Sequence, residues 1–500
     1  MEHGCQGFSL MLSHNFQLGP VRRTPSVPAE GTRLSVCRLP SFPGVLALLL
    51  GLLVGAAGCG LYHARSPGER ISYEEKIGKE FALEASSQLR LMDEPEILDF
   101  SKRLGKRLAS NVYGSPYTYK FFVVRNPTMN AFAVPGGYVY VFAGLLSTVE
   151  TEDELAAVLA HEISHVEGNH FIRGQKKLDA ANIAAAAAMI LAATLGGGQQ
   201  AAAVGTLAQA TQITTALHYS REFEREADRG SIPLLRASGF DTKGILTLFE
   251  RFHSQARLNA ADLPPYFYTH PLPMERLYEV RSWIEATPSP AARKDPIRGF
   301  DTAKATARLR IQEQQEVLAS LEDGAVKNPS DARAQFLPGY VYLKIGNLAL
   351  ALPYLEKALN LDPSQAEHAM YLGRAHCLAG RLDAAEEFLA IASRLEPDNS
   401  MLEVFLGDLA AQRGKTEEAL RHYERAVALD PDSSFAEANL AMAYGRGGLT
   451  GKSYLHLALA YKNAGEYLKS LYYFKKARRL LDKDSKDAKL AEEQILWFEG

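Results

Sequence analysis

The chain has 500 residues, more than one hydrophobic core usually serves, so two or more domains are expected. Its hydrophobic content of 47% and charged content of 23% are those of an ordinary globular protein. The net charge of -3 gives no basic field for nucleic acid, and the four cysteines are too widely separated for a disulfide framework or a cysteine-rich zinc module.

The first element along the chain is a short apolar segment, Val45 to Ala57. It is shorter than the roughly 20 residues of a membrane-spanning helix but fits the core of a signal peptide. The letters AAGC at 56–59 resemble the lipobox of bacterial lipoproteins, although leucine is commoner than alanine at the first of these positions. We therefore predict a signal region over residues 1–58, whose true start could lie downstream of the first methionine, and lipidation of Cys59. A plain cleaved signal or an uncleaved anchor is the alternative.

Either form of this segment predicts export of the remaining chain to the periplasm. Lipidation of Cys59 would anchor the protein to a membrane. Gly60 follows this cysteine, whereas an aspartate there would indicate retention in the inner membrane. The outer membrane is therefore mildly preferred.

Residues 59–286 show mixed periodicity, in which helical stretches surround alternating β-prone runs at Tyr117 to Val124 and Tyr138 to Phe142. This mixture predicts an α+β domain, with helices around a small sheet. A capping box at Thr151 to Glu154 then opens a predicted helix that contains the letters HEISH at residues 161–165.

The HEISH segment brings three chemically active residues together. His161 and His165 are four positions apart and so lie on one helix face, where their imidazoles can converge on one metal ion. Glu162 lies beside them and can take a proton from a zinc-activated water. This is the HExxH pattern of zinc peptidases, and two histidines on the surface of an ordinary helix are the alternative. The capped helix and its apolar buried side favour the zinc site.

The third ligand decides the class of peptidase. A metzincin would need a histidine at position 171, which is Phe171, and His170 misses that position by one. Glu224 in the segment SREFEREAD can instead complete a site of two histidines and one glutamate. Asp228, on the same helical face, is expected to accept a hydrogen bond from a ligand histidine, most simply His161. The other glutamates of this segment are expected to be solvated helix charges: Glu222 and Glu226.

HEISH and SREFEREAD resemble the HtpX-like and CAAX-prenyl-protease-like gluzincin peptidases. The resemblance implies a gluzincin-type zinc metallopeptidase domain. It also implies that the segment NAFAVPGG leads into an edge strand of the active-site cleft, where an extended substrate could pair by main-chain hydrogen bonds. The substrate-binding residues expected on this basis are Asn130, Ala131 and Phe132.

The same resemblance places His270, in the letters THP, beside the zinc. There it could act as a fourth ligand that holds the enzyme inactive, or it could stabilise the oxyanion of the reaction. Arg276 is the other candidate for the second role, and the sequence does not choose between them. Without the resemblance, a histidine in a proline-rich loop is more often a turn residue.

Residues 287–302 are rich in proline and lack periodicity, which predicts an interdomain linker. From residue 325 onward the sequence repeats with a period of 34 and resembles the tetratricopeptide repeat, which predicts an all-α solenoid over residues 303–500. The register changes at Gly465, 51 residues after Gly414, which predicts one additional helix near Phe435 to Tyr444. The positions that define the period are Pro329, Pro363, Pro397, Pro431, Gly346, Gly380 and Gly414.

Together these motifs predict an envelope-located zinc endopeptidase, and the resemblance implies that it hydrolyses peptide bonds of misfolded or misassembled proteins. Its cofactor would be Zn²⁺, its repeats would recruit substrate or envelope protein partners, and nucleic acid is not an expected partner. The alternative is a chaperone or scaffold of outer-membrane assembly with a latent or inactive peptidase domain. The complete set of ligands and base favours the enzyme: His161, Glu162, His165 and Glu224.

Overall fold

The computed structural model describes residues 67–174, 221–258, 266, 270–271, 274–286 and 296–499. The predicted signal region, Cys59 and most of the predicted linker lie outside these residues. Within the described part of the chain, no helix combines the length and the apolar character that a membrane span requires.

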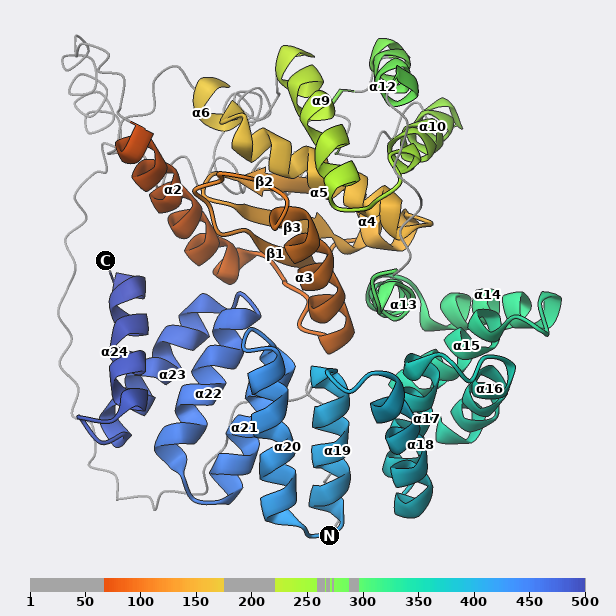
Figure 1. The fold of residues 1–500 in the computed structure, drawn as a ribbon, viewed down its shortest axis with the longest axis vertical. Coiled ribbons are helices and arrows are strands. Elements are labelled where there is room, and N and C mark those ends of the chain that lie inside the picture. The colour runs from red at the N-terminus through yellow and green to blue at the C-terminus, as the bar shows by residue number, and fades with distance from the viewer. Residues whose placement is uncertain are drawn as a thin grey trace, which may run out of the picture.

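The N-terminal part surrounds one small sheet with helices, and the C-terminal part is entirely helical (Figure 1). The predicted fold class, an α+β domain followed by an all-α solenoid, is confirmed. The elements of the N-terminal part, in chain order, are α2 (Pro67–Gln88), α3 (Pro95–Ala109), β1 (Lys120–Val124), β2 (Ala131–Val134), β3 (Tyr138–Phe142), α4 (Ala143–Thr148), α5 (Glu152–Glu167), α6 (His170–Gly174), α9 (Arg221–Ala237), α10 (Lys243–Leu258) and α12 (Met274–Ala286).

The sheet has the strand order β1-β3-β2, in which β3 runs parallel to β1 and antiparallel to β2. All five side chains of β3 are buried, because this central strand is covered on both faces. Val139 and Val141 face a core that includes α3 and α5, whereas Tyr138, Tyr140 and Phe142 face a second core. The alternation follows from the two-residue period of a strand.

The capping box predicted at the start of α5 is present in its Thr151 half, whereas Glu154 reaches the amide one residue before the N-cap. The Thr151 side chain accepts a hydrogen bond from the Glu154 backbone amide at 3.2 Å, and the Glu154 carboxylate accepts one from the backbone amide of Glu150 at 2.7 Å. These bonds satisfy amide groups that have no partner within a helix. The helix then lies between β2 and α9, which buries nearly its whole length.

The C-terminal part is an arc of paired helices that runs beneath the N-terminal part and returns to it at α23 (Figure 1). The first of these helices begins at Phe300, so the last three residues of the predicted linker are helical. The elements of this part are α13 (Phe300–Ile311), α14 (Gln314–Lys327), α15 (Ala332–Lys344), α16 (Leu348–Leu361), α17 (Ala366–Leu378), α18 (Leu382–Leu395), α19 (Ser400–Gln412), α20 (Thr416–Leu429), α21 (Ser434–Arg446), α22 (Thr450–Asn463), α23 (Tyr467–Leu480) and α24 (Lys486–Glu499).

The helix predicted near Phe435 to Tyr444 is α21, but it continues the repeat rather than interrupting it. Gly448 follows it, 34 residues after Gly414, and both glycines adopt a positive φ between paired helices. Helix α22 then packs closely against both α21 and α23. The change of register therefore begins after Gly448, because α22 is the second helix of the pair that it forms with α21 and also the first helix of the pair that it forms with α23.

The end of the solenoid packs directly on the sheet. The second core joins aromatic residues of β1 and β3 to α23 and α24, and the rings of Phe122 and Tyr467 lie 6.4 Å apart. Ion pairs between Lys102 and Asp430 at 3.2 Å, and between Lys344 and Glu96 at 3.1 Å, connect α3 to the repeats. This shared core holds the α+β part and the repeats in direct contact.

Candidate metal centre

Four buried residues from separate segments converge beside the sheet. Each of them offers a nitrogen or a carboxylate oxygen, and these four atoms all lie within 4.8 Å of one another. Two come from α5 and one from α9, while the fourth lies between α10 and α12. The four residues are His161, His165, Glu224 and His270.

The distances between these atoms fit a single small metal ion. The Nε2 atoms of His161 and His165 are 2.9 Å apart, and they lie 3.5 and 3.3 Å from the two carboxylate oxygens of Glu224. Ligands held at about 2.1 Å in a tetrahedral zinc site are roughly 3.4 Å from one another. Two imidazoles and a carboxylate are also a donor set that zinc accepts. The residues present therefore fit this cofactor.

His270 completes the cluster from the opposite side. Its Nδ1 lies 3.0 Å from Oε1 of Glu224, and its Nε2 lies 3.5 Å from Oε1 of Glu162. The imidazole stacks on Tyr266 with ring centroids 4.7 Å apart, and the His270 amide donates to the Tyr266 carbonyl at 2.8 Å. Two contacts with Tyr266 thus hold the ring beside the three other ligand candidates.

A carboxylate on α9 supports the first histidine. Nδ1 of His161 lies 3.0 Å from Oδ1 of Asp228, as expected for the acceptor that orients a ligand histidine. Arg276 donates to both oxygens of Asp228 at 2.8 Å and contacts Glu224 at 2.6 Å. Its third partner is the carbonyl of Pro271, at 2.6 Å. The charge of Arg276 is therefore directed at the two carboxylates.

The second histidine has an outer partner that was not expected from the sequence. Nδ1 of His165 lies 2.7 Å from Nδ1 of His170, and Nε2 of His170 lies 3.3 Å from Glu226. Glu226 in turn accepts from Arg173 at 2.9 Å, while its side chain stays 46% exposed, in agreement with its interpretation as a solvated helix charge. Glu222 is exposed, in agreement with that interpretation. The only sequence signal was a histidine five residues after His165.

Burial and neighbouring charges give the carboxyl groups different acidities. Burial raises the pKa of Glu162, which suits a group that accepts and later returns a proton. Burial also opposes ionisation of Glu224, but its neighbours His270 and Arg276 and the hydrogen bonds from the two other histidines hold its pKa well below the usual value, as a metal ligand requires. Burial disfavours the charged form of His161, yet its two carboxylate neighbours, Asp228 and Glu224, raise its pKa to about 10.

The predicted substrate strand lies next to this cluster. β2 pairs only with β3, so its other edge carries no strand among the described residues. Asn130 accepts a hydrogen bond from the Ala131 amide at 3.0 Å, and the side chains of Asn130, Ala131 and Phe132 are all buried. Phe132 stacks on Tyr140, with ring centroids 5.0 Å apart. Any pairing here would use the main chain, because these side chains point into the protein.

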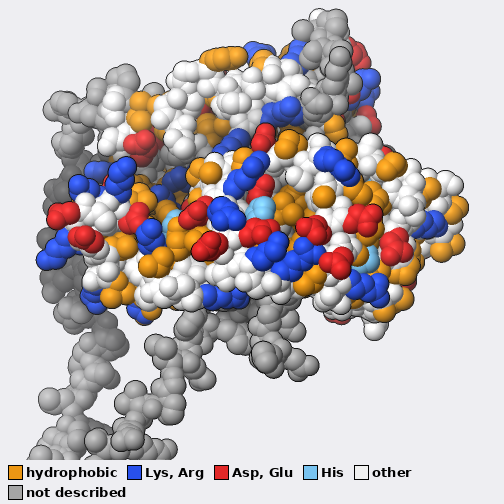
Figure 2. All heavy atoms as spheres, turned by 60° about the horizontal axis from the view of Figure 1, so that its bottom comes forward, with side chains coloured by type: hydrophobic (Ala, Val, Ile, Leu, Met, Phe, Trp, Pro, Cys, Tyr) orange, Lys and Arg blue, Asp and Glu red, His pale blue; other side chains and the backbone are white. Residues whose placement is uncertain are grey.

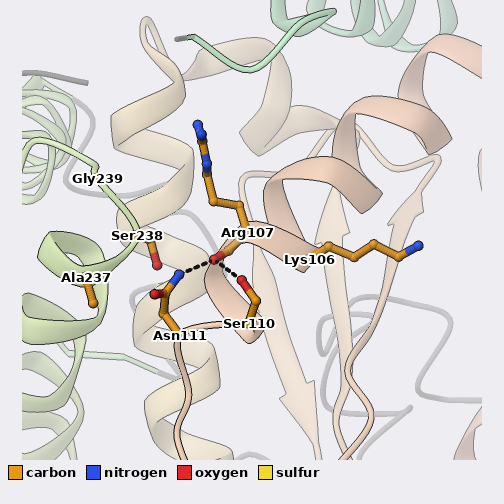
Figure 3. Close-up of a pocket in the computed structure, with 7 residues that line it drawn as sticks. All are labelled: Lys106, Arg107, Ser110, Asn111, Ala237, Ser238 and Gly239. Carbon is orange, nitrogen blue, oxygen red and sulfur yellow. Dashed lines mark hydrogen bonds between the residues drawn. The ribbon is translucent and has the colours of Figure 1, made fainter. Parts of the chain in front are cut away.

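A cavity of about 560 Å³ lies away from the cluster, between the C-terminal ends of α3 and α9 (Figure 3). None of the four ligand candidates lines it. Two of its side chains, Ser110 and Asn111, donate to the carbonyl of Arg107 at 3.1 and 2.8 Å. These two side chains thus bond to the last turn of α3.

Comparison with known proteins agrees with this geometry. The family described as peptidase family M48 matches residues 101–284, and tetratricopeptide-repeat families match residues 302–365, 339–400 and 404–433. The beta-barrel assembly-enhancing protease of Escherichia coli strain K12 is 31% identical over 216 residues, which are 42% of this chain. The matched segment spans 44% of that relative, less than half of its length.

Two shorter relatives are covered more fully. The metalloproteases YcaL and LoiP of Escherichia coli strain K12 are each 30% identical, over 196 and 203 residues. Each match covers 38% of this chain and 73% of the relative. The similarity thus extends over most of each of these two relatives. With the HExxH helix and its glutamate partner inside the matched segment, the chain belongs to peptidase family M48 and carries tetratricopeptide repeats after the peptidase domain.

Proposed function

We propose that this protein is a zinc-dependent endopeptidase of the bacterial cell envelope. The observation that carries the proposal is the convergence of His161, His165 and Glu224 in a buried site, with Glu162 beside them. Membership of a peptidase family and similarity to proteins named as metalloproteases support the same chemistry. A scaffold with an inactive peptidase domain is not favoured, because all three ligands and the base are present.

In this scheme His161, His165 and Glu224 hold the zinc ion, which when bound would polarise the scissile carbonyl and make a water molecule more acidic. Glu162 takes the proton of that water and passes it to the amine that leaves. Asp228 orients His161, and Arg276 holds both carboxylates of α9 in place. Burial, which raises the pKa of Glu162, favours its protonated form and so its acceptance of the proton.

His270 is proposed to regulate the site as a fourth ligand. Its position within 4.8 Å of the other three ligand atoms supports this role. Zinc with four protein ligands has the closed arrangement of a structural site, so the resting enzyme would be nearly inactive. Substrate or a partner would then have to move His270 away. Stabilisation of the oxyanion by the same imidazole is the second possible role.

The substrates are proposed to be extended segments of misfolded or misassembled proteins. The edge of β2, with Asn130, Ala131 and Phe132, would pair with them through the main chain. The repeats would recruit substrates or envelope protein partners. Figure 2 shows acidic and basic side chains intermixed on the face that it presents, which supports protein partners rather than nucleic acid.

We further propose a periplasmic location with a lipid anchor at Cys59, with the outer membrane mildly preferred.

Metal analysis and peptide hydrolysis test the proposed chemistry. Glu162→Gln should keep about one zinc per chain and lose peptidase activity, because Glu162 is the base and not a ligand. Glu224→Gln should lose most of the zinc, whereas Glu222→Gln, an exposed change on the same helix, should keep both zinc and activity. Undiminished turnover by Glu162→Gln would reject the assignment of the base, and full zinc retention by Glu224→Gln would reject the ligand set.

Cell fractionation tests the proposed anchor. Cys59→Ser should release the protein from membranes into a soluble exported fraction, because the lipid would be lost. A variant that stays integrated in the membrane would show that another segment attaches the protein.

A further inference from the structure

The ligand candidate His165 has an outer chain of polar contacts that the proposed reaction does not use. We propose that His170 is a positioning residue for the ligand His165, and that Glu226 completes its support. The inference deepens the proposed function and rests on it, because it concerns how the zinc ligand is held.

The two imidazoles face each other through their Nδ1 atoms. Nε2 of His165 points into the ligand cluster, and its Nδ1 lies 2.7 Å from Nδ1 of His170. A histidine that binds zinc through Nε2 carries its proton on Nδ1 and donates it to an outer acceptor. Nδ1 of His170 can be that acceptor only when its own proton is on Nε2. The contact therefore selects one tautomer for each ring.

Glu226 favours the tautomer that His170 needs. Nε2 of His170 lies 3.3 Å from a Glu226 oxygen, an ion-pair distance at which the carboxylate charge favours a proton on this nitrogen. Arg173 donates to both oxygens of Glu226 at 2.9 Å and to the carbonyl of Gly168, which keeps the carboxylate in place. The contacts thus run from the ligand His165 through His170 and Glu226 to Arg173. A carboxylate at the far end makes the acceptor nitrogen of His170 more basic and strengthens its bond to the ligand.

The backbone after α5 is shaped to bring His170 to this position. Asn169 adopts a positive φ of 51°, which non-glycine residues rarely do, and turns the chain back at the end of the helix. A Cβ added at Gly168 would collide with the ring of His170. The ring itself is fully buried and stacks on Phe223, with centroids 4.7 Å apart and planes 7° from parallel. The orientation of the His170 ring, and so of its acceptor Nδ1, is therefore fixed by the turn at Asn169, by the space at Gly168 and by the stacking on Phe223.

The arrangement mirrors the support of the other ligand histidine. Nδ1 of His161 meets the carboxylate of Asp228, which Arg276 holds, whereas His165 reaches the carboxylate of Glu226 through an intervening imidazole. Loss of an outer partner of a zinc ligand typically weakens metal affinity or activity by about 10–100-fold. His170 should therefore contribute to zinc affinity without touching the metal.

Zinc affinity, measured by competition with a chromophoric chelator, tests this role in the otherwise intact Glu162→Gln protein, which should not digest itself. His170→Phe keeps the ring and its stacking on Phe223 but removes the acceptor, so affinity should fall about 10–100-fold. His170→Asn offers an oxygen near the position of Nδ1 and should restore most of the loss. The absorption spectrum of the cobalt-substituted protein should shift in His170→Phe and return towards the parent in His170→Asn.

Two matched controls separate positioning from packing. His376→Phe changes another buried histidine, which stacks on a phenylalanine and lies 4.0 Å from a glutamate within the repeats, and should leave affinity unchanged. Glu226→Gln should weaken zinc binding by a smaller factor, whereas Glu222→Gln should have no effect. Because Glu226 is exposed, this pair reports on the role even if His170→Phe does not fold.

If His170→Phe and Glu226→Gln both bound zinc as tightly as the Glu162→Gln parent, the inference would be overturned. An equal loss in His170→Phe and His170→Asn, with no change in the cobalt spectrum, would overturn it as well, because packing would then explain the effect. Failure of the Glu162→Gln parent to bind zinc would instead reject the proposed metal centre itself, and with it this inference. The parent measurement therefore distinguishes the two failures.

Discussion

Replacement of Arg276 by methionine should destabilise the metal-free protein by about 3–5 kcal/mol, the usual cost of removing one partner from a buried ion pair. The side chain of Arg276 is only 4% exposed, and its two carboxylate partners, Asp228 and Glu224, are 3% and 1% exposed. Methionine fills much of the same volume but leaves both carboxylates without their guanidinium. The decrease in the free energy of unfolding therefore measures the loss of charge compensation more than the loss of packing.

Bound zinc should reduce the decrease in unfolding free energy that Arg276→Met causes. A bound cation at Glu224 replaces part of the missing positive charge, so the difference between Arg276→Met and the parent should be smaller in the zinc-loaded protein. Asp228 does not contact the cation in this scheme and should keep its share of the penalty. We therefore expect partial rescue by zinc, and not full recovery.

Urea unfolding of the zinc-free and zinc-loaded forms, in the Glu162→Gln background, measures both effects. Arg281→Met is the matched control, because Arg281 lies on the same helix and forms an ion pair with Glu250 at 2.7 Å in which its side chain is 41% exposed. Exposed pairs contribute less than about 1 kcal/mol. The reasoning would be refuted if Arg276→Met and Arg281→Met lowered the free energy of unfolding equally. It would also be refuted if zinc left the decrease in Arg276→Met unchanged.

Three further predictions address regulation, docking of the repeats and pH. His270→Ala should raise peptide hydrolysis and lower zinc affinity if His270 is the fourth ligand; reduced turnover with full zinc content would assign it to the oxyanion, and parental values of both would leave it a turn residue. Gly465→Ala should reduce the free energy of urea unfolding by about 1–3 kcal/mol more than Gly448→Ala does, because both glycines have a positive φ but only a Cβ at Gly465 would meet Phe122, at 2.7 Å; equal losses would contradict the docking. Burial raises the pKa of Glu367 to about 7, so its ionisation at higher pH destabilises the fold. Glu367→Gln should therefore stabilise the protein by about 1–3 kcal/mol at pH 8 and several-fold less at pH 5 in thermal unfolding, and the same gain at both pH values would contradict this sign.

The sequence alone determined the features that depend on local spacing. The capping box, the shared face of His161 and His165, and the shared face of Glu224 and Asp228 all follow from positions three or four apart in one helix. The period of 34 likewise identifies paired helices, because each repeat buries the same face against its neighbours. These relations hold whatever the rest of the chain does.

Only the tertiary structure decided which distant groups meet. Arg276 was a candidate for the oxyanion until its contacts with Asp228 and Glu224 became visible, because no local spacing relates α12 to α9. The packing of α23 on the sheet is equally nonlocal, since Tyr467 and Phe122 are far apart in the sequence.

His170 shows the same limit at short range. Its position depends on a positive φ and on the empty space at a glycine, and neither the backbone angle nor that space follows from the order of side chains. Spacing predicts neighbours within one helix, but the path of the chain after the helix decides which groups reach the ligands.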